Sequence, residues 1–502
     1  MNPLFLTDGY KTGHHQQYPK GTTRVYSNFT PRSNKYAPKG CNAVVSFGQQ
    51  MVMKQLHETF QRDFFSQPKE TVCGQMKEEL SLYLGTEYDV THFEKLHDLG
   101  YLPIAVKSIS EGTMVPIKVP VLTIYNTHPD FYWLTNYLET ILSNLLWKPM
   151  TSATIARQYR KVLTKWMEKT DPANAWFIDW QGHDFSMRGM DSAEAVISSG
   201  LGHLTAFSGT DSLPAIYGAR KYYGAEGFVA GSVPATEHSV MCAGGKEDEA
   251  ETFRRLLETY PKGILSVVSD TWDLWKVCTE HVVTLKEEIL ARDGKLVIRP
   301  DSGDPADILC GLNTSPAMVS AEQAAHPSYK GVIELLWDVF GGTVNEQGYK
   351  VLDPHIGAIY GDSITIDRAN EICSRLAAKG FASTNVVLGI GSFTYQYNTR
   401  DTFGFAMKAT YVEINKPKFP GDSNPEGHEI FKDPITDDGT KKSATGLLCV
   451  EEHDGQIGLY DKVSWATEGT GLLRMIYMNG EFHNETTLAE IRNTVKETLN
   501  KD

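Results

Sequence analysis

Charged and polar residues recur in this sequence directly after short apolar runs. Seven such runs lie between about residues 175 and 393, and the residues that end or follow them include His183, Asp184, Asp211, Glu237, His238, Asp270, Arg299, Asp301, Asp362, Gly389 and Gly391. A single Asp after a strand most often caps the next helix, but capping does not explain Arg299 or His238. Because the carboxyl ends of parallel strands meet at one edge, we expect these residues to line one active-site mouth.

Several basic residues could hold a phosphate-bearing ligand at that mouth. The forked guanidinium groups of Arg188, Arg299 and Arg400 suit phosphate, and so do the point charges of Lys408, Lys432 and Lys441. For the lysines, solvated surface charge is an equally good interpretation. The turn-rich runs YGD and GIGSF add backbone N–H groups that can hold an anion.

Other common kinds of site are missing from the sequence. Neither G-x-x-x-x-G-K-[ST] nor G-x-G-x-x-G after a strand occurs, which argues against a common nucleotide triphosphatase and a Rossmann dehydrogenase. No H-E-x-x-H and no G-x-S-x-G occurs, which argues against a zinc hydrolase and a serine esterase. We expect the adjacent His14 and His15 to be a solvated pair rather than metal ligands.

The elements that must position the mouth alternate regularly over residues 151–393. The apolar runs AWFIDW, HLTAFSG, GFVAGSV, GILSVVSD, KLVIRPD, HIGAIYGD and NVVLGIG are each followed by a turn and a helical stretch. This alternation is typical of βαβ units around a parallel sheet. We therefore predict an α/β fold whose catalytic domain, residues 151–393, is an irregular parallel α/β barrel.

The flanking portions, residues 1–150 and 394–502, have a different pattern. TRVYSNF, AVVSFG and IAVKSISEGTMVPIKVPVLTIYN predict strands in the first portion, and FGFAMKATYVEIN, TGLLCVEE and LLRMIYMNG predict strands in the second. Helical patterns cover about 49–84 (two helices), 129–147, 151–169 and 487–499. We predict that the two portions pack together as one strand-rich second domain.

Composition narrows the class of protein. The chain has 502 residues, 41% of them hydrophobic, and a formal net charge of −14, which argues against a nucleic-acid coat. Its seven cysteines are scattered and never spaced as C-x-x-C, as is usual in a reducing compartment. The start MNPLFLTDGYK lacks the long apolar core of a signal peptide, and no apolar run approaches 18 residues. We expect a cytoplasmic protein with no nucleic-acid or membrane partner.

The motifs TDGYKTGHHQQYP, HDFSMRG, FSGTDS, GSVPATEHS, SVVSD, IRPDSGDP, YGDS, TRD and FKDP occur in this order. In sequence and order they closely resemble the nicotinamide phosphoribosyltransferases, a family of type II phosphoribosyltransferases. The resemblance extends from about residue 5 to the C-terminal helix. The sequence departs from the family in GIGSF, where Ser392 and Phe393 stand in place of glycines.

The resemblance implies transfer of a 5-phosphoribosyl group from phosphoribosyl pyrophosphate to nicotinamide, which yields nicotinamide mononucleotide and pyrophosphate. It implies that Phe185 and Tyr10 sandwich the pyridine ring, with the tyrosine supplied by the second subunit of a homodimer. It also implies that Asp211 accepts a hydrogen bond from the carboxamide. A carboxylate at this position would repel nicotinate, so we expect nicotinamide to be preferred.

The resemblance assigns further roles by motif. Arg188, His238 and Arg299 would lie near the pyrophosphate and Asp301 on the ribose, and Asp270 would act through magnesium-bound water. The other substrate-binding candidates are Ser232, Gly361, Asp362, Gly391, Ser392, Arg400 and Lys408. Candidates for phosphate contacts or contributions from the other subunit are Asp8, Arg32, Lys432 and Lys441. The expected cofactor is Mg²⁺, and ATP could stimulate the enzyme by phosphorylating His238.

Three alternatives remain open at this point. The chain could be a nicotinate phosphoribosyltransferase, against which Asp211 argues. It could be a non-catalytic binding descendant, but the charged residues His238, Arg299, Asp301 and Arg400 are all retained. It could also be a phosphate-binding α/β-barrel enzyme of different chemistry, but the TDGYK motif would then have no purpose.

Overall fold

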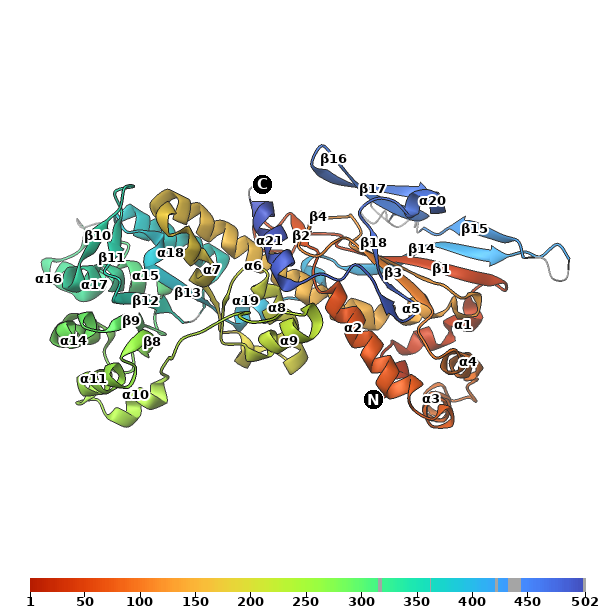
Figure 1. Cartoon of the computed structure of the whole chain (residues 1–502), viewed down its shortest axis with the longest axis horizontal. Coiled ribbons are helices and arrows are strands. Elements are labelled where there is room, and N and C mark those ends of the chain that lie inside the picture. The colour runs from red at the N-terminus through yellow and green to blue at the C-terminus, as the bar shows by residue number, and fades with distance from the viewer. Residues whose placement is uncertain (315–317, 362, 420–422, 432–443, 500–502) are drawn as a thin grey trace. The chain divides into compact units, whose positions relative to one another are not determined.

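The structure, a computed structural model, describes residues 1–314, 318–361, 363–419, 423–431 and 444–499. The chain divides into two compact units (Figure 1). The first comprises Met1–Thr154, Ala219–Ala225 and Asn398–Asp502, and the second comprises Ile155–Gly218 and Glu226–Tyr397. None of the helices in the described ranges combines the length and the apolar run that crossing a bilayer requires.

The second unit is built on a six-stranded, wholly parallel sheet with the order β7-β6-β13-β12-β9-β8. Its strands are β6 (Gly182–Asp184), β7 (Gly209–Thr210), β8 (Lys262–Val268), β9 (Asp293–Arg299), β12 (Ile356–Tyr360) and β13 (Val386–Ile390). A separate antiparallel pair consists of β10 (Gly342–Val344) and β11 (Lys350–Leu352). The predicted parallel α/β architecture is confirmed.

Two of the seven apolar runs do not form strands of this sheet. AWFIDW lies in the 3₁₀ helix η5 (Pro172–Phe177) and helix α7 (Ile178–Gln181). Pro172 is the first residue of η5, a position at which proline supports a helix start. GFVAGSV makes only isolated parallel bridges, and HLTAFSG contributes a strand only at its last residue, Gly209. A short apolar run cannot by itself distinguish a buried helix from a strand.

The segment 227–236, which begins with GFVAGSV, nevertheless explains why the sheet is barrel-like. Gly231 bridges Gly209 of the edge strand β7, and Ala235 bridges Ser266 of the opposite edge strand β8. The backbone N–H of Gly231 donates to the carbonyl of Ser208 at 2.9 Å, and that of Thr236 donates to Ser266 at 3.0 Å. One irregular extended segment thus connects the two edges of the parallel sheet.

Helices surround this sheet, and most of them contribute side chains to its apolar core. They are α7 (Ile178–Gln181), α8 (Ala193–Leu204), α9 (Leu213–Tyr223), α10 (His238–Gly244), α11 (Glu249–Thr259), α12 (Leu274–Lys276), α13 (Val282–Thr284), α14 (Lys286–Leu290), α15 (Pro305–Cys310), α16 (Ala321–Ala325), α17 (Val332–Phe340), α18 (Ile366–Ala378) and α19 (Ser392–Gln396). On β9, Leu296 and Ile298 belong to the core that these helices share with the sheet. Because side chains alternate along a strand, Arg299 points to the opposite face of the sheet.

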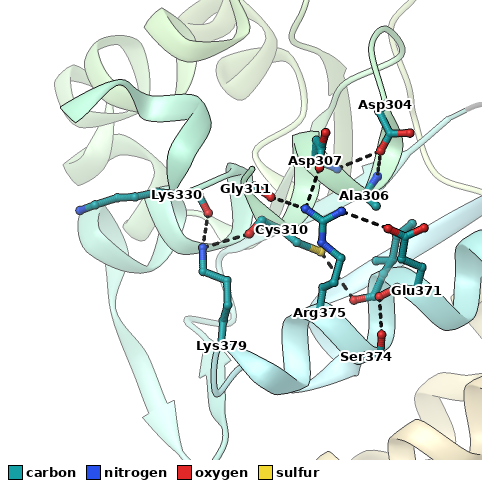
Figure 2. A network of polar contacts seen from close by, with 11 residues as sticks. Asp304, Ala306, Asp307, Cys310, Gly311, Lys330, Glu371, Ser374, Arg375 and Lys379 are labelled. Carbon is teal, nitrogen blue, oxygen red and sulfur yellow. Dashed lines mark hydrogen bonds and ion pairs between the residues drawn. The ribbon is translucent and has the colours of Figure 1, made fainter. Parts of the chain in front are cut away.

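A polar network holds three of these helices together (Figure 2). Arg375 of α18 donates to the carboxylate of Asp307 in α15 at 2.7 Å. Lys379 donates to the carbonyl oxygens of Cys310 at 2.9 Å and Lys330 at 2.8 Å, just before α17. The network therefore anchors α15, the helix that follows the IRPDSGDP segment.

The first unit contains a seven-stranded antiparallel sheet with the order β15-β14-β1-β5-β3-β18-β19. Strands of this unit are β1 (Thr22–Thr30), β2 (Ala43–Val45), β3 (Ile104–Ser108), β4 (Met114–Pro116), β5 (Leu122–Asn126), β14 (Ala406–Asn415), β15 (Pro425–Glu429), β16 (Leu447–His453), β17 (Gln456–Val463), β18 (Arg474–Met478) and β19 (Glu481–Phe482). Since β14 pairs with β1 and β18 with β3, the N- and C-terminal portions form one strand-rich unit, as predicted.

The helices of the first unit include three short ones that the sequence did not predict, α1 (His14–Gln17), α4 (Thr91–Leu99) and α20 (Trp465–Glu468), and the helix predicted over residues 129–147 is divided. The other helices are α2 (Gln49–Phe60), α3 (Lys69–Leu84), α5 (Leu134–Tyr137) and α21 (Leu488–Thr498), together with the start of α6 (Glu139–Thr170). The sequence predicts separate helices before and after Pro149, but α6 runs through this proline. Surrounding packing can hold a helix together where proline removes one backbone hydrogen bond.

The segment Ala219–Ala225 belongs to the first unit, and its residues Ala219, Tyr222 and Tyr223 are buried. Tyr223 stacks on Phe47 with ring centroids 5.6 Å apart, and its hydroxyl donates to Glu111 Oε2 at 2.8 Å. The other carboxylate oxygen of Glu111 accepts the backbone N–H of Gln50 at 2.8 Å. Burial raises the pKa of Glu111 to about 7, although these hydrogen bonds oppose the shift.

We predict that Tyr223→Phe lowers the free energy of unfolding by about 1–3 kcal/mol, because a buried carboxylate oxygen then loses its donor. Urea denaturation followed by circular dichroism measures the change. Tyr217→Phe, at a side chain that is 58% exposed, is the matched control and should shift the midpoint little. Equal midpoints for the Tyr223→Phe variant and the native chain would contradict this role of the hydroxyl.

Candidate active site

The carboxyl ends of the parallel strands bring most of the predicted site residues to one edge of the second unit. Phe185 follows β6, Asp211 follows β7, Asp270 follows β8, Gly361 follows β12 and Gly391 follows β13, while Arg299 ends β9. Neighbouring strands are in direct register, as in the pairs His183↔Gly209 and Val268↔Arg299. A common strand direction thus gathers residues that lie up to about 200 positions apart in sequence.

Asp211 lies in a hydrogen-bonded cluster at the end of β7. His183 Nε2 is 2.8 Å from Asp211 Oδ1, and the Ser232 hydroxyl donates to the same oxygen at 2.5 Å. Partial burial acts to raise the pKa of Asp211, but the hydrogen bonds from His183 and Ser232, with the nearby charge of Arg299, lower it below its ordinary value. Asp211 is therefore a carboxylate at neutral pH, and its side chain is 43% exposed.

The side chains of Phe185 and Arg299 contact each other at the edge of the sheet. The Arg299 guanidinium lies 5.2 Å from the centre of the Phe185 ring, a cation–π distance. Two glycines make this arrangement possible. A Cβ atom at Gly389 would come within 2.8 Å of the Phe185 ring, and one at Gly361 would come within 2.9 Å of Arg299 Nε and of Asp301 Oδ1.

His238 and two carboxylates form a second cluster. His238 Nε2 lies 3.9 Å from Asp270 Oδ1 and 3.8 Å from Asp301 Oδ2, and its Nδ1 is 3.1 Å from the hydroxyl of Thr271. Asp270 Oδ2 accepts the backbone N–H of Asp301 at 2.8 Å and the hydroxyl of Ser302 at 2.6 Å. Asp270 Oδ1 is buried without a hydrogen-bond partner among the described residues, so the cluster contains an unsatisfied acceptor.

Gly391 and Ser392 lie at the start of α19, whose buried residue Tyr395 contacts His203 of α8. The Tyr395 hydroxyl lies 2.8 Å from His203 Nδ1, and His203 Nε2 lies 2.9 Å from the carbonyl of Gly209. Ser392 packs against Gly189, where a Cβ atom would come within 2.5 Å of the serine Cβ. Helix α19 thereby brings the GIGSF segment next to the 3₁₀ helix η6 (Met187–Gly189), which carries the exposed Arg188.

Two predicted site residues, Asp8 and Tyr10, lie in the first unit at the 3₁₀ helix η2 (Gly9–Gly13). The Tyr10 side chain is 66% exposed and has an edge contact with His14, with ring centroids 5.4 Å apart. Asp8 accepts the hydroxyl of Thr140 at 2.8 Å. Tyr10 therefore presents most of its ring to the surroundings of this unit.

The predicted basic residues of the first unit lie around β1 and β14. Arg32, just after β1, donates its backbone N–H to Phe403 at 3.0 Å, in the segment that follows Arg400. Arg400 lies 3.6 Å from its neighbour Asp401, and both side chains are exposed. Lys408 is an exposed residue of β14 and is paired in register with Asn28 of β1. Asp362, Lys432 and Lys441 lie outside the described residues.

The structure corrects the prediction for His15 and adds contacts of His183 that the sequence did not predict. His15 is half-buried and stacks on His92 at 3.9 Å between ring centroids, so it is not the solvated residue expected from the sequence. His183, which the sequence predicts at the mouth without a specific role, contacts both Asp211 and, at 4.6 Å between ring centroids, Phe185. Its position at the end of an apolar run, one residue before the HDFSMRG carboxylate, was the available signal.

The described residues do not contain a metal site made of protein ligands alone. Nowhere in these ranges do three His, Cys, Asp or Glu side chains gather closely enough to hold an ion. The buried and unpartnered Asp270 Oδ1 is instead suited to accept a hydrogen bond, for example from the water shell of a cation.

Comparison with known proteins gives the family context. Residues 180–494 match the nicotinate phosphoribosyltransferase (NAPRTase) family, and residues 2–104 match the nicotinamide phosphoribosyltransferase N-terminal domain. A protein of Acinetobacter baylyi (strain ATCC 33305 / BD413 / ADP1) named nicotinamide phosphoribosyltransferase is 50% identical, over 99% of this chain and 98% of the relative. One of the same name from Xanthomonas campestris pv. campestris (strain 8004) is 32% identical over 98% of this chain and 97% of the relative. The resemblance seen in the sequence motifs is confirmed.

Solved structures resemble the chain in fold. The crystal structure of human nicotinic acid phosphoribosyltransferase has a TM-score of 0.54 at 16% identity, covering 99% of this chain and 94% of that one. Nicotinate-nucleotide pyrophosphorylase from Pyrococcus furiosus has a TM-score of 0.56 at 14% identity, covering 100% and 96%. At such low identity these similarities concern the fold alone.

Proposed function

This chain belongs to the nicotinate phosphoribosyltransferase family, and we propose that it is a pentosyltransferase that makes nicotinamide mononucleotide. The 5-phosphoribosyl group of phosphoribosyl pyrophosphate is transferred to the ring nitrogen of nicotinamide, and pyrophosphate leaves. Relatives named nicotinamide phosphoribosyltransferase match over nearly the whole chain, which favours this reaction over the nicotinate alternative. The reaction is a step of NAD biosynthesis.

The observation that carries the choice of base is the ionised carboxylate of Asp211 at the strand edge. A carboxylate accepts hydrogen bonds and donates none, so it pairs with the NH₂ of a carboxamide. The carboxylate of nicotinate would bring a second negative charge to the same place. The Phe185 ring close by supplies a flat face for a flat heteroaromatic ring.

The charged residues of the edge would act on the phosphoribosyl donor. Arg188, Arg299 and His238 bind the pyrophosphate, and Asp301 binds the ribose hydroxyls. As the bond from C1 of the ribose to the pyrophosphate oxygen stretches, negative charge grows on the leaving group, and a guanidinium stabilises it. The pyridine nitrogen then attacks C1 from the opposite face. It carries no proton, so no general base is needed, and placement of the two substrates supplies much of the rate.

The remaining candidates would complete the mononucleotide site. They are Ser232, Gly361, Asp362, Gly391, Ser392, Arg400 and Lys408, with Asp8, Arg32, Lys432 and Lys441 as further candidates for phosphate contacts. In support, the Ser232 hydroxyl donates to Asp211, and Gly361 leaves room beside Arg299.

We propose Mg²⁺ as the cofactor, bound to the pyrophosphate and its own waters. The fit rests on Asp270, whose buried Oδ1 can accept a hydrogen bond from a water ligand. Mg²⁺ commonly keeps several waters and binds substrate phosphates rather than an all-protein cage. When bound, it neutralises charge on the leaving group.

We also propose a homodimer, in which Tyr10 of one subunit completes the ring-binding site of the other. The support is the exposure of Tyr10, together with that of the aromatic residues Phe393 and Tyr397, which are 59% and 79% exposed. Phe393 and Tyr397 stack on each other with ring centroids 5.0 Å apart, and contiguous exposed apolar patches often mark interaction surfaces.

We further propose a cytoplasmic location. Burial raises the pKa of the Cys278 and Cys310 thiols to about 12, so these thiols are unreactive, as suits structural cysteines in a reducing compartment.

The test of the reaction is product formation from phosphoribosyl pyrophosphate and Mg²⁺, with nicotinamide and nicotinate assayed in parallel by chromatography. We expect mononucleotide from nicotinamide and little from nicotinate. Product mainly from nicotinate would leave the chemistry standing but overturn the choice of base. No product from either base would favour a non-catalytic binding protein.

ATP is a further proposed substrate, because His238 lies half-exposed beside two carboxylates and a hydroxyl. A ring nitrogen would attack the γ-phosphorus of ATP, and ADP would leave. We predict that ATP raises the rate of the native enzyme severalfold and that His238→Ala abolishes this stimulation. Steady-state assays with and without ATP measure it, with His326→Ala, at an exposed histidine of the same unit, as control. Stimulation that survives in the His238→Ala enzyme would contradict the proposed phosphohistidine.

A further inference from the structure

The two carboxylate oxygens of Asp211 have different surroundings. Both hydrogen bonds that described residues make to this side chain end on Oδ1, one from His183 at 2.8 Å and one from Ser232 at 2.5 Å. Oδ1 is thus already saturated by protein donors. Oδ2 is the oxygen that remains to accept a donor from a ligand.

His183 is held so that it can donate to this oxygen. The imidazole lies against Gly209, where a Cβ atom would come within 2.7 Å of its Nδ1, and against the Phe185 ring at 4.6 Å between centroids. The side chain is only 10% exposed. Since a carboxylate only accepts hydrogen bonds, Nε2 must carry the proton that is shared with Asp211.

The two donors differ in how well they are fixed. Ser232 is exposed and lies in the segment that makes only isolated bridges to the sheet. His183 is a residue of β6, paired in register with Gly209 of β7 and Gly389 of β13. His183 is therefore the donor that can hold the orientation of Asp211 relative to the Phe185 ring.

We propose that His183 is a positioning residue for base selection, which fixes Asp211 Oδ1 so that the ionised Oδ2 faces the amide group of the bound base. The inference rests on the proposed function, because it concerns how the enzyme distinguishes a carboxamide from a carboxylate. Without His183 the carboxylate is free to rotate, and one of its supporting donors is lost. Both effects weaken the acceptance of nicotinamide and the rejection of nicotinate.

Two substitutions separate this role from packing. His183→Phe keeps a ring between Gly209 and Phe185 but removes the donor, whereas His183→Gln keeps an N–H donor close to the position of Nε2. We expect His183→Phe to lower the ratio of kcat/KM for nicotinamide to that for nicotinate by about tenfold or more, as for loss of a hydrogen bond to a charged group. The loss should lie mainly in the KM for nicotinamide, with the KM for phosphoribosyl pyrophosphate little changed. His183→Gln should restore most of the ratio.

A double-substitution test shows whether His183 acts through Asp211. In an Asp211→Asn background, adding His183→Phe should leave the ratio of the two bases within about threefold, because the group it positions is already altered. A native ratio in the His183→Phe enzyme, or an equally large further fall in the Asp211→Asn background, would overturn the proposal. Failure of the native enzyme to use either base would instead overturn the proposed function, so the two failures are distinguishable.

Discussion

Replacing Arg299 by alanine is expected to lower kcat by about 10²–10³-fold, the size of effect seen when one donor to a developing negative charge is removed. The guanidinium ends strand β9 and lies 5.2 Å from the centre of the Phe185 ring, and its Nε is buried with no hydrogen-bond partner among the described residues. The described protein groups therefore leave part of its hydrogen-bonding capacity unused. Single-turnover and steady-state assays with nicotinamide measure the loss of turnover.

Two control variants test whether the loss of turnover depends on the guanidinium group of Arg299. Arg299→Lys keeps the charge but loses the fork, so it should recover only part of the rate. Arg254→Ala removes an arginine of helix α11 that pairs with Glu251 and Glu288, and it should leave kcat almost unchanged. A normal kcat in the Arg299→Ala enzyme would refute the role of this residue in stabilising the leaving group.

Replacing Asp211 by asparagine is expected to reduce the preference for nicotinamide over nicotinate by about 10²-fold or more. The native carboxylate pairs with an amide donor and repels a second carboxylate, and a site built on such a difference can discriminate by about 10⁴-fold. Asparagine removes the negative charge and can turn its own NH₂ toward the carboxylate of nicotinate. The measurement is the ratio of kcat/KM values for the two bases.

Asp191→Asn is the matched control, because Asp191 is an exposed aspartate of the same unit. It should leave the ratio of the two bases at its native value. An unchanged ratio in the Asp211→Asn enzyme would remove Asp211 from base selection, and with it the positioning role inferred for His183.

Most of the parallel sheet was predictable because its longer strands have unambiguous patterns. GILSVVSD, KLVIRPD, HIGAIYGD and NVVLGIG contain all or most of the strands β8, β9, β12 and β13. The prediction of a strand at AWFIDW was wrong because aromatic and aliphatic residues also occur in buried helices. Only the neighbouring residues decide between a strand and a helix here. The prediction that a helix ends before Pro149 was also wrong, since packing outweighed the local cost of proline in α6.

The grouping of the residues at the strand ends was predictable, but their mutual contacts were not. Parallel strands must end at one edge, so the grouping of Asp211, Asp270 and Arg299 follows from the strand pattern. That the side chain of His183, rather than that of Asp184, contacts the carboxylate of Asp211 depends on which face of β6 each side chain occupies and on the register with β7. The sequence does not specify that register.

The sequence by itself determined the chemistry that this protein has available: the residue types at the strand ends, the motif order of a phosphoribosyltransferase, and the parallel arrangement that brings those ends together. Only the tertiary structure decided which oxygen of Asp211 is occupied, that Asp270 Oδ1 is left without a partner, and that Gly361 and Gly389 make room for Arg299 and Phe185. The physical reason is that the two kinds of information act over different distances along the chain. Local patterns reflect burial along one strand, whereas hydrogen bonds and close contacts depend on distances of a few ångströms between strands that are distant in sequence.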